Sequence, residues 1–232
     1  MSKRIIVAID GPAGAGKSTI ARRVAQRLGF LYIDTGAMYR AVALWALRLN
    51  VELTDMHRLE QLALEADIQL ADSLVSLNGE VITDAIRTPE VSEAASKVSA
   101  VPGVRRALVD KQRTMASSTS VVMEGRDIGT VVFPEAEVKI FLDAGEDIRA
   151  QRRLQEWAQK GEPVESAEVV KQLRGRDQRD RNRTEAPLVQ APDAVYLDTT
   201  SMAVEDVEEA ILKIVRDRTS NGKQLAGKEL AR

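Results

Sequence analysis

A glycine-rich segment near the N-terminus constrains the fold of this chain more than any other feature. Residues 11–18 read Gly-Pro-Ala-Gly-Ala-Gly-Lys-Ser and match the pattern G-x-x-x-x-G-K-[ST]. The apolar run at residues 5–9 precedes them and is typical of a strand buried on both faces. A helical pattern over residues 17–28 follows and ends at Gly29, which suits a helix C-cap. Strand, loop and helix in this order predict a loop that binds phosphate groups.

The spacing of the glycines has a physical reason. Glycine adopts positive φ angles and lets backbone N–H groups approach a phosphate closely, and the N-terminus of the following helix favours an anion. Lys17 is expected to reach the β- and γ-phosphates, and the Ser18 hydroxyl is expected to bind Mg²⁺. A chance glycine-rich turn is the alternative, which the flanking strand and helix disfavour. We therefore expect Mg²⁺ as cofactor and ATP at Gly11, Pro12, Ala13, Gly14, Ala15, Gly16, Lys17, Ser18 and Thr19.

Apolar runs and helical patterns alternate along most of the chain. Strands are expected near residues 31–33, 121–123, 138–142 and 195–197, and helices near 36–49, 56–66, 104–115, 146–160, 167–181 and 204–218. Such alternation favours a parallel sheet with helices on both faces. Together with the loop, it predicts an α/β fold of the P-loop NTPase type, with a parallel five-stranded sheet flanked by helices.

The pattern changes between about residues 67 and 83. Apolar and polar residues alternate there, and Asn78-Gly79 is a strong signal for a β-hairpin. Thr88 and Pro89 then resemble the N-cap and first position of a helix, and Pro102-Gly103 is expected to separate that helix from the next. These signals predict a small hairpin-containing insertion, residues 64–100, in a core of residues 1–63 and 101–218. The polar residues 219–232 are expected to be disordered.

Composition and charge exclude several classes of function. The chain has 33 basic and 35 acidic side chains, and its net charge of −2 gives no general attraction to nucleic acid or to a membrane. The absence of cysteine excludes disulfides and thiol catalysis, and the single histidine, His57, argues against His-dependent chemistry. No apolar run reaches the length of a membrane span or of a signal-peptide core. We expect a monomeric cytoplasmic protein that binds small molecules.

A phosphate-binding loop occurs in switches, motors and kinases, so it does not define the reaction. None of the four asparagines precedes a lysine, which argues against a GTPase with an Asn-Lys-x-Asp motif, and the length best suits a small-molecule kinase. Near the end of the chain, Arg176, Asp180 and Arg183 fall at i, i+4 and i+7 and share one helix face. That face could hold a nucleotide, but a solvent-exposed face with Arg–Asp pairs fits the pattern equally well.

Three further segments carry a more specific resemblance. They are residues 34–40, which read Asp-Thr-Gly-Ala-Met-Tyr-Arg; residues 124–134, which begin Glu-Gly-Arg-Asp; and the Arg-rich residues 174–183. With the glycine-rich loop, they make residues 5–218 similar to the bacterial cytidylate kinase family. The resemblance implies transfer of the γ-phosphoryl group of ATP to CMP or dCMP, which gives ADP and CDP or dCDP. It also implies that the insertion binds the nucleoside monophosphate and that residues near 153–175 form a short lid.

The resemblance assigns roles to individual residues. Stabilisation of the transferring phosphoryl group falls to Lys17, Arg40, Arg126, Arg153 and Arg183. Arg149 and Arg152 are the other candidates for the lid arginine that contacts ATP, and Glu124 is expected to hold a Mg²⁺-bound water. Contacts to CMP are expected from Thr35, Arg40, Ser96, Arg105, Arg126, Asp127, Arg176, Asp180 and Arg183.

The predicted base contacts Ser96, Arg105 and Asp127 suit cytosine. Asp127 and Ser96 can accept hydrogen bonds from the exocyclic amine, and Arg105 can donate to N3 or O2. Uracil reverses two of these polarities, and each mismatch costs about 1–3 kcal/mol. Without the resemblance, Thr35 could equally be a helix N-cap, and Ser96 and Arg105 ordinary surface residues. The remaining alternatives are a kinase for UMP, dTMP or shikimate, and a non-catalytic nucleotide-binding switch.

Overall fold

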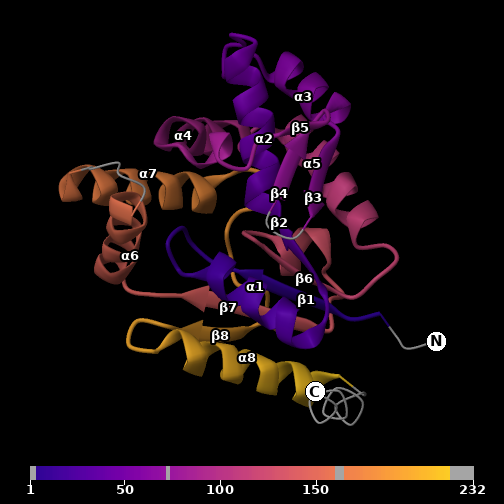
Figure 1. Ribbon diagram of the computed structural model, residues 1–232, viewed down its shortest axis with the longest axis vertical. Coiled ribbons are helices and arrows are strands. Elements are labelled where there is room, and N and C mark those ends of the chain that lie inside the picture. Colours follow the sequence, from indigo (N-terminus) through magenta and orange to yellow (C-terminus); the bar gives the residue numbers. More distant parts are fainter. Residues whose placement is uncertain (1–3, 72–73, 160–164, 220–232) are drawn as a thin grey trace.

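The computed structural model describes residues 4–71, 74–159 and 165–219. The loop expected at 161–163 and the polar tail expected at 219–232, apart from Thr219, lie outside the described residues. Two sheets with helices around them form the fold, and the larger sheet carries the glycine-rich loop (Figure 1). Within the described ranges, every helix is too short or too polar to cross a membrane.

The larger sheet is parallel and five-stranded, as the sequence predicts. Its strands lie in the order β2-β6-β1-β7-β8, and every adjacent pair runs in the same direction. All residues of β1 are buried, as expected for a strand covered on both faces. The five strands are β1 (Ile6–Asp10), β2 (Leu31–Asp34), β6 (Val121–Gly125), β7 (Val138–Asp143) and β8 (Val195–Asp198).

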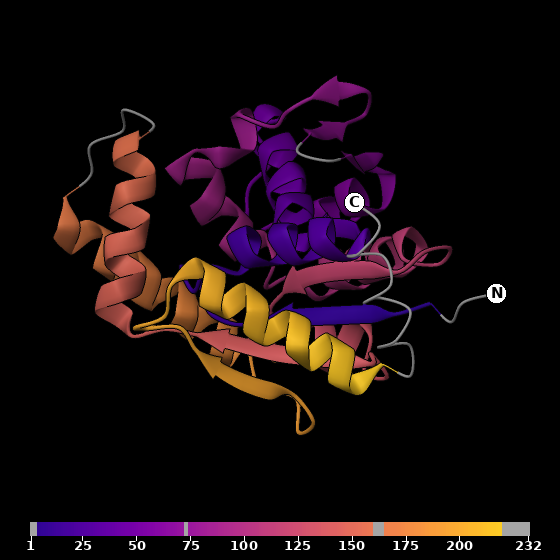
Figure 2. The same cartoon turned by 60° about the horizontal axis from the view of Figure 1, so that its bottom comes forward.

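Helices cover both faces of this sheet because the side chains of each strand alternate in direction. On one face, Val7 and Ile9 pack against apolar residues of α1 (Lys17–Leu28) and α8 (Val204–Arg218), and Figure 2 shows α8 running along the sheet. On the other face, Ile6 and Ala8 share a cluster with α5 (Pro102–Met115) and the π-helical turn η2 (Ile128–Val132). The carboxyl ends of β1 and β6 thus lie side by side, at the edge where parallel α/β proteins bind ligands.

Local sequence signals set most helix boundaries. α1 covers the predicted residues, and Gly29 ends it in the left-handed conformation with a φ of 64°. Thr88 caps α4 (Pro89–Val98), since its hydroxyl accepts a hydrogen bond from Val91 N at 3.2 Å. One prediction is wrong. Pro102 and Gly103 form the first turn of α5 and do not separate it from α4. Proline is accepted there because the N–H groups of the first helical turn have no partner within the helix, so the missing N–H of proline costs no hydrogen bond.

The predicted hairpin forms a second, antiparallel sheet. Its strands β3 (Ile68–Ala71), β4 (Leu74–Leu77) and β5 (Glu80–Val81) lie in that order. Asn78 and Gly79 join β4 to β5 with φ angles of 52° and 84°. A two-residue hairpin turn requires these positive angles, and an Asn-Gly pair adopts them readily.

The small sheet belongs to a layer of helices next to the main sheet, at the top of Figure 1. It shares one hydrophobic cluster, from Ala37 to Leu108, with α2 (Thr35–Arg48), α3 (Met56–Glu65), α4 and α5. A 3₁₀ turn, η1 (Ala85–Arg87), leads into α4. We call these elements, α2–α5 with β3–β5, the upper layer. The boundaries of an insertion at 64–100 stay a prediction, because apolar contacts continue from that segment into α2, α3 and α5.

Two further helices, α6 (Glu146–Gln159) and α7 (Ser166–Asn182), pack against each other at one side of the molecule (Figure 1). Trp157 of α6 and Val169 and Leu173 of α7 belong to a small apolar cluster that also contains Ala13. α6 and α7 therefore contact the glycine-rich loop directly. The predicted lid near 153–175 falls on these helices and on the segment between them.

Candidate active site

The glycine-rich loop forms part of the wall of a cavity of about 810 Å³. Residues of the loop, the start of α2, the end of β6, α6 and α7 line it. Most residues that the sequence assigns to nucleotide binding are among them: Ala13, Gly14, Ala15, Gly16, Lys17, Ser18, Thr19, Thr35, Arg40, Arg105, Glu124, Arg126, Asp127, Arg153, Arg176, Asp180 and Arg183. Gly11, Pro12 and Ser96 are described by the structure but do not line this cavity.

Three glycines give the loop its shape. Gly11, Gly14 and Gly16 have φ angles of 150°, 77° and 91°, which side-chain-bearing residues rarely adopt. At Gly11 there is also no room for a side chain, because a Cβ atom would lie 1.9 Å from the carbonyl oxygen of Leu142. The backbone conformation of the loop therefore requires the glycines of the motif.

Lys17 begins α1 and is buried in the cavity wall. Its ammonium group donates a hydrogen bond to Pro12 O at 2.7 Å. Burial, and next the charge of Arg126, lowers the pKa of Lys17 to about 7. An ammonium group in such surroundings gains from a nearby anion, and a triphosphate is one.

Replacing Lys17 with methionine is expected to stabilise the protein by about 1–3 kcal/mol at pH 7 in the absence of nucleotide, because a buried ammonium group is removed. The pKa of Lys17 is about 7 in the folded chain and 10.5 ordinarily, so between these values the unfolded chain binds more protons. The free energy of unfolding of the wild type therefore gains from Lys17 as the pH rises from 7 to 10. The K17M variant lacks this gain, so its advantage should shrink over that range in urea unfolding experiments.

The control for this prediction is Lys213→Met. Lys213 lies on α8, its side chain is 71% exposed, and it pairs with Asp217 at 2.6 Å. Its replacement should change the free energy of unfolding by less than about 1 kcal/mol. If the advantage of K17M stays constant between pH 7 and pH 10, a lowered pKa of Lys17 is ruled out.

Glu124 ends β6 beside the loop and accepts a hydrogen bond from Tyr32 Oη at 2.6 Å. Burial, and next the charge of Asp34, raises the pKa of Glu124, while Lys17 and a hydrogen bond from Ser18 lower it. The Glu124 carboxylate and the Ser18 hydroxyl are oxygen ligands of the kind that Mg²⁺ takes. Among the described residues, no three His, Cys, Asp or Glu side chains gather as a metal site. This donor set fits an ion held mostly by phosphate and water oxygens.

Asp10, at the end of β1, connects the loop to the segment after β6. Its carboxylate accepts hydrogen bonds from the N–H groups of Ile128 and Gly129, both at 2.8 Å. These residues begin η2, directly after Arg126 and Asp127. Burial raises the pKa of Asp10 to about 6, although the two hydrogen bonds lower it. The sequence analysis missed Asp10, because only the pairing of β1 with β6 brings it to η2.

The structure at the start of α2 rules out the alternative that Thr35 is the helix N-cap. Asp34, not Thr35, is the N-cap, since its carboxylate accepts a hydrogen bond from Ala37 N at 2.9 Å. The Thr35 hydroxyl donates instead to Glu124 O at 2.7 Å. Arg40 donates to the other Asp34 oxygen at 2.9 Å, which holds its guanidinium group at the cavity.

Two of the three predicted base contacts form a pair. Arg105 and Asp127 make an ion pair in which both side chains are buried. Arg105 also donates to Ser99 O at 3.2 Å, and its guanidinium group lies 5.5 Å from the centroid of the Tyr39 ring. The alternative that Arg105 is an ordinary surface residue is therefore wrong.

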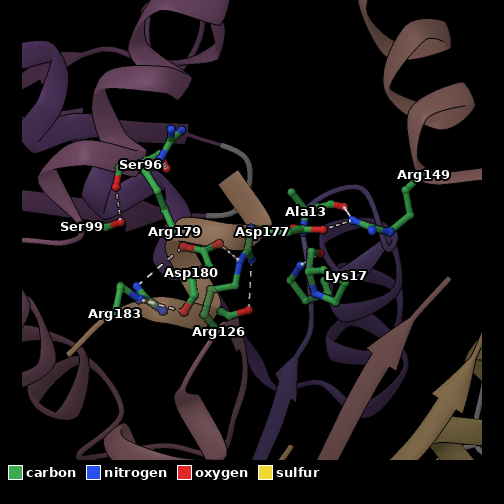
Figure 3. A network of polar contacts seen from close by, with 12 residues as sticks. Ala13, Lys17, Ser96, Ser99, Arg126, Arg149, Asp177, Arg179, Asp180 and Arg183 are labelled. Atoms are coloured by element: carbon green, nitrogen blue, oxygen red, sulfur yellow. Dashed lines mark hydrogen bonds and ion pairs between the residues drawn. The ribbon is translucent and has the colours of Figure 1, made fainter. Parts of the chain in front are cut away.

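Ser96, the third predicted base contact, is also buried, so the surface alternative is wrong for it as well. Its hydroxyl accepts a hydrogen bond from Arg179 Nε at 2.9 Å (Figure 3). Arg179 Nη2 also donates to Glu93 at 2.8 Å. Arg179 thus links α7 to α4. The sequence analysis missed it, although Arg179 follows Arg176 by three residues, a spacing that shares a helix face.

Arg176 and Asp180 lie on α7 and line the cavity, so the alternative of a solvent-exposed face is wrong. Arg183 also lines the cavity, but it lies just beyond the end of α7 and not on the helix face as predicted. Asp180 accepts a hydrogen bond from Arg126 Nε at 2.8 Å, and Arg183 Nη1 lies 3.9 Å from the other carboxylate oxygen (Figure 3). Burial alone would raise the pKa of Asp180, but the charges of Arg126, Arg176 and Arg183 lower it. The Asp180 carboxylate therefore interacts favourably with the guanidinium groups of Arg126, Arg176 and Arg183.

Three of the cavity's arginines have buried nitrogen atoms with no hydrogen-bond partner among the described residues: Arg40 Nε, Arg176 Nε and Arg183 Nη2. Such unpaired buried donors are rare and destabilising in folded proteins. Burial, and next the charge of Arg126, lowers the pKa of Arg176 to about 9, and burial also lowers that of Arg183. The cavity thus combines positive charge with unpaired donors, the arrangement that binds phosphate groups.

The three arginines of α6 differ in their surroundings. Arg149 is buried and pairs with Asp177 at 2.6 Å, away from the cavity lining. Arg152 lines the cavity and donates to Thr199 O at 2.8 Å. Arg153 lines the cavity as well, and its guanidinium group pairs with Glu156 at 2.7 Å. Arg153 remains our candidate for a contact with ATP.

Comparisons with known proteins show the family of this chain. Residues 7–217 match the family model described as cytidylate kinase. A cytidylate kinase of Solibacter usitatus (strain Ellin6076) is 62% identical over 226 residues, which cover 97% of this chain and 97% of that protein. One of Pelotomaculum thermopropionicum is 51% identical over 223 residues, which cover 94% and 97%.

A solved structure shares the fold alone. The crystal structure of an uncharacterized protein from Eubacterium ventriosum ATCC 27560 matches with a TM-score of 0.50 at 12% identity, over 90% of this chain and 97% of that one. The family model and the curated relatives extend over nearly the whole chain. The chain therefore belongs to the cytidylate kinase family.

Proposed function

We propose that this protein transfers the γ-phosphoryl group of Mg-ATP to CMP or dCMP, giving ADP and CDP or dCDP. The observation that carries the proposal is the group of unpaired buried donors on Arg40, Arg176 and Arg183 beside a phosphate-binding loop. Phosphoryl transfer between two phosphorylated molecules gathers negative charge at one point, and catalysis depends on cations placed there. The similar proteins described as cytidylate kinases support this reaction.

The donor site in this proposal is the loop of residues 11–19. Its N–H groups and Lys17 hold the phosphates of ATP, and Arg153 reaches them from α6. Ser18 binds Mg²⁺ directly and Glu124 through water. The ion, when bound, neutralises charge that develops on the β- and γ-phosphate oxygens.

The acceptor site faces the loop across the cavity. Arg40 and Arg183 hold the phosphate of the acceptor, and Arg126 neutralises charge on the group in transfer. Arg176 and Asp180 hold the ribose hydroxyls. No general base is needed in this mechanism, because the acceptor phosphate is already anionic near neutral pH.

The base lies against the Arg105–Asp127 pair in this proposal. Asp127 and Ser96 accept hydrogen bonds from the cytosine amine, Arg105 donates to the ring, and Thr35 contacts the base or ribose. The burial of all three base-reading side chains supports discrimination, because unmatched polar groups cost most where water is absent. A preference for CMP and dCMP over UMP follows.

We also propose that residues 64–100 bind the acceptor nucleotide and that residues near 153–175 act as a lid over ATP. Ser92 and Ala95 of α4 line the cavity and support the first assignment, and the position of Arg153 in the cavity wall supports the second. We expect the protein to act as a monomer on nucleotides and not on nucleic acid. The lid assignment predicts protection of ATP from water during transfer.

A coupled assay of ADP release from Mg-ATP tests the proposed reaction. CMP, dCMP, UMP, AMP, GMP and dTMP are added separately, and fast release is expected with CMP and dCMP alone. Release with a different acceptor would keep the kinase reaction but overturn the base contacts. If ATP binds and no acceptor stimulates release, the protein is a nucleotide-binding switch instead.

A further inference from the structure

A buried ion pair between α6 and α7 holds one residue of the phosphate-binding loop through both of its backbone polar groups. Arg149 Nη1 donates to Ala13 O at 2.9 Å and to the Asp177 carboxylate at 2.6 Å. The other Asp177 oxygen accepts a hydrogen bond from Ala13 N at 3.3 Å. Figure 3 shows Arg149 and Asp177 on either side of Ala13, with Lys17 below. The N–H and the carbonyl group of Ala13 are therefore both engaged by this pair.

These contacts determine which N–H groups of the loop can meet a phosphate. Pro12 has no N–H, and that of Ala13 is engaged by Asp177. In a planar trans peptide, a carbonyl group and the N–H of the next residue point in opposite directions. The hydrogen bond from Arg149 to Ala13 O therefore turns the N–H of Gly14 away from α6. Arg152, which donates to Ala15 O at 3.3 Å, acts in the same way on the N–H of Gly16.

The surroundings of the pair keep this geometry rigid. The side chains of Arg149 and Asp177 are 8% and 12% exposed, and Arg149 Nε donates to Ala144 O at 3.0 Å. The side chain of Ala13 lies in the apolar cluster between α6 and α7. At Gly14 a Cβ atom would lie 3.0 Å from Arg149 O, so the loop and α6 are in close contact. Rigid donors of fixed direction are what phosphate binding requires.

We propose that Arg149 and Asp177 are positioning residues for the phosphates of ATP. They act through the backbone of Ala13 and do not contact the nucleotide. The inference rests on the proposed function, because it takes residues 11–19 as the ATP site. It also separates the arginines of α6 into one that orients the loop, Arg149, and one that faces the nucleotide, Arg153.

The variants Arg149→Lys and Asp177→Asn test the proposal. Lysine keeps the charge but has a single donor nitrogen, so it cannot bond Ala144 O through one nitrogen while a second bonds Ala13 O and Asp177 as Arg149 does. Asparagine keeps an acceptor but loses the charge. We expect either change to weaken Mg-ATP binding about 10- to 100-fold in calorimetry, and the double variant to lose little more than the single variants. The KM for CMP should stay within about 2-fold, because the acceptor contacts are unchanged.

The chain offers a matched control that joins the same two helices. Arg174 of α7 pairs with Glu146 of α6, but this pair is 68% and 36% exposed and does not line the cavity. Arg174→Gln should bind Mg-ATP as the wild type does. The proposal is overturned if the Arg149 and Asp177 variants melt at lower temperature but bind Mg-ATP normally, or if the KM values for ATP and CMP rise together. If the wild type binds Mg-ATP but CMP does not stimulate turnover, only the proposed reaction is contradicted. Calorimetry measures the binding of Mg-ATP and does not depend on turnover.

Discussion

Replacing Arg126 with alanine is expected to lower kcat at least about 1,000-fold and to raise the KM for ATP less than about 5-fold. Arg126 lies at the end of β6, its side chain is 17% exposed, and it lines the cavity between the loop and α7. In the proposed function, Arg126 meets the phosphoryl group only while it moves between ATP and the acceptor. Its removal should therefore destabilise the transition state much more than bound ATP.

Steady-state kinetics, with the concentrations of ATP and CMP both varied, give kcat and the KM for ATP separately. The fold should survive the change, because Asp180 keeps Arg183 at 3.9 Å and the charge of Arg176 when Arg126 is removed. Arg106→Ala is the control, since its side chain is 61% exposed and pairs only with surface carboxylates in the described residues. If kcat falls and the KM for ATP rises by the same factor, Arg126 acts in binding and not in transfer.

Asp127→Asn is expected to lower kcat/KM for CMP by about 100-fold or more and to lower the ratio of CMP to UMP turnover. The carboxylate balances the buried charge of Arg105, and an amide of the same size does not. The amide can also donate a hydrogen bond, which suits the O4 atom of uracil better than the cytosine amine. Measurements of kcat/KM for CMP and UMP on the variant and the wild type give both quantities.

The matched control for this change is Asp110→Asn. Asp110 lies on α5 with a side chain that is 79% exposed, 4.0 Å from Arg113. Its replacement should leave both values of kcat/KM within about 2-fold, as for an exposed ion pair. An Asp127→Asn variant with reduced activity but an unchanged CMP to UMP ratio would mean that Asp127 supports the cavity without reading the base.

The sequence predicts those parts of the fold that depend on neighbouring residues. The φ angles of Asn78 and Gly79 are the ones that their turn demands, and Gly29 ends α1 where the helical pattern stops. The common face of Arg176 and Asp180 also follows from helix geometry, and the structure places that face at the cavity, whereas Arg183 lies just beyond the end of α7. Each of these features is decided within a few residues of the chain.

Contacts between distant segments could not be predicted in the same way. Arg179 and Ser96 are 83 positions apart, and Arg149 and Ala13 are 136 apart. Nothing local shows which of several arginines on a helix reaches a given carbonyl or hydroxyl group. The roles of Arg149, Asp177 and Arg179 depend on how α6 and α7 pack against the loop and the upper layer, which only the structure provides.

The two hydrogen bonds of Asp10 have a mechanical consequence. They fasten β1, the strand that leads into the loop, to the turn that follows Arg126, and that turn comes directly after the neighbouring strand β6. The spacing between the donor phosphates and the cation that meets them is thus set inside one stiff body. This link uses only Asp10, Ile128 and Gly129 and includes no residue of the upper layer, α6 or α7. Holding the phosphate-binding loop next to Arg126 is, in this architecture, a task of β1, β6 and the turn that follows them.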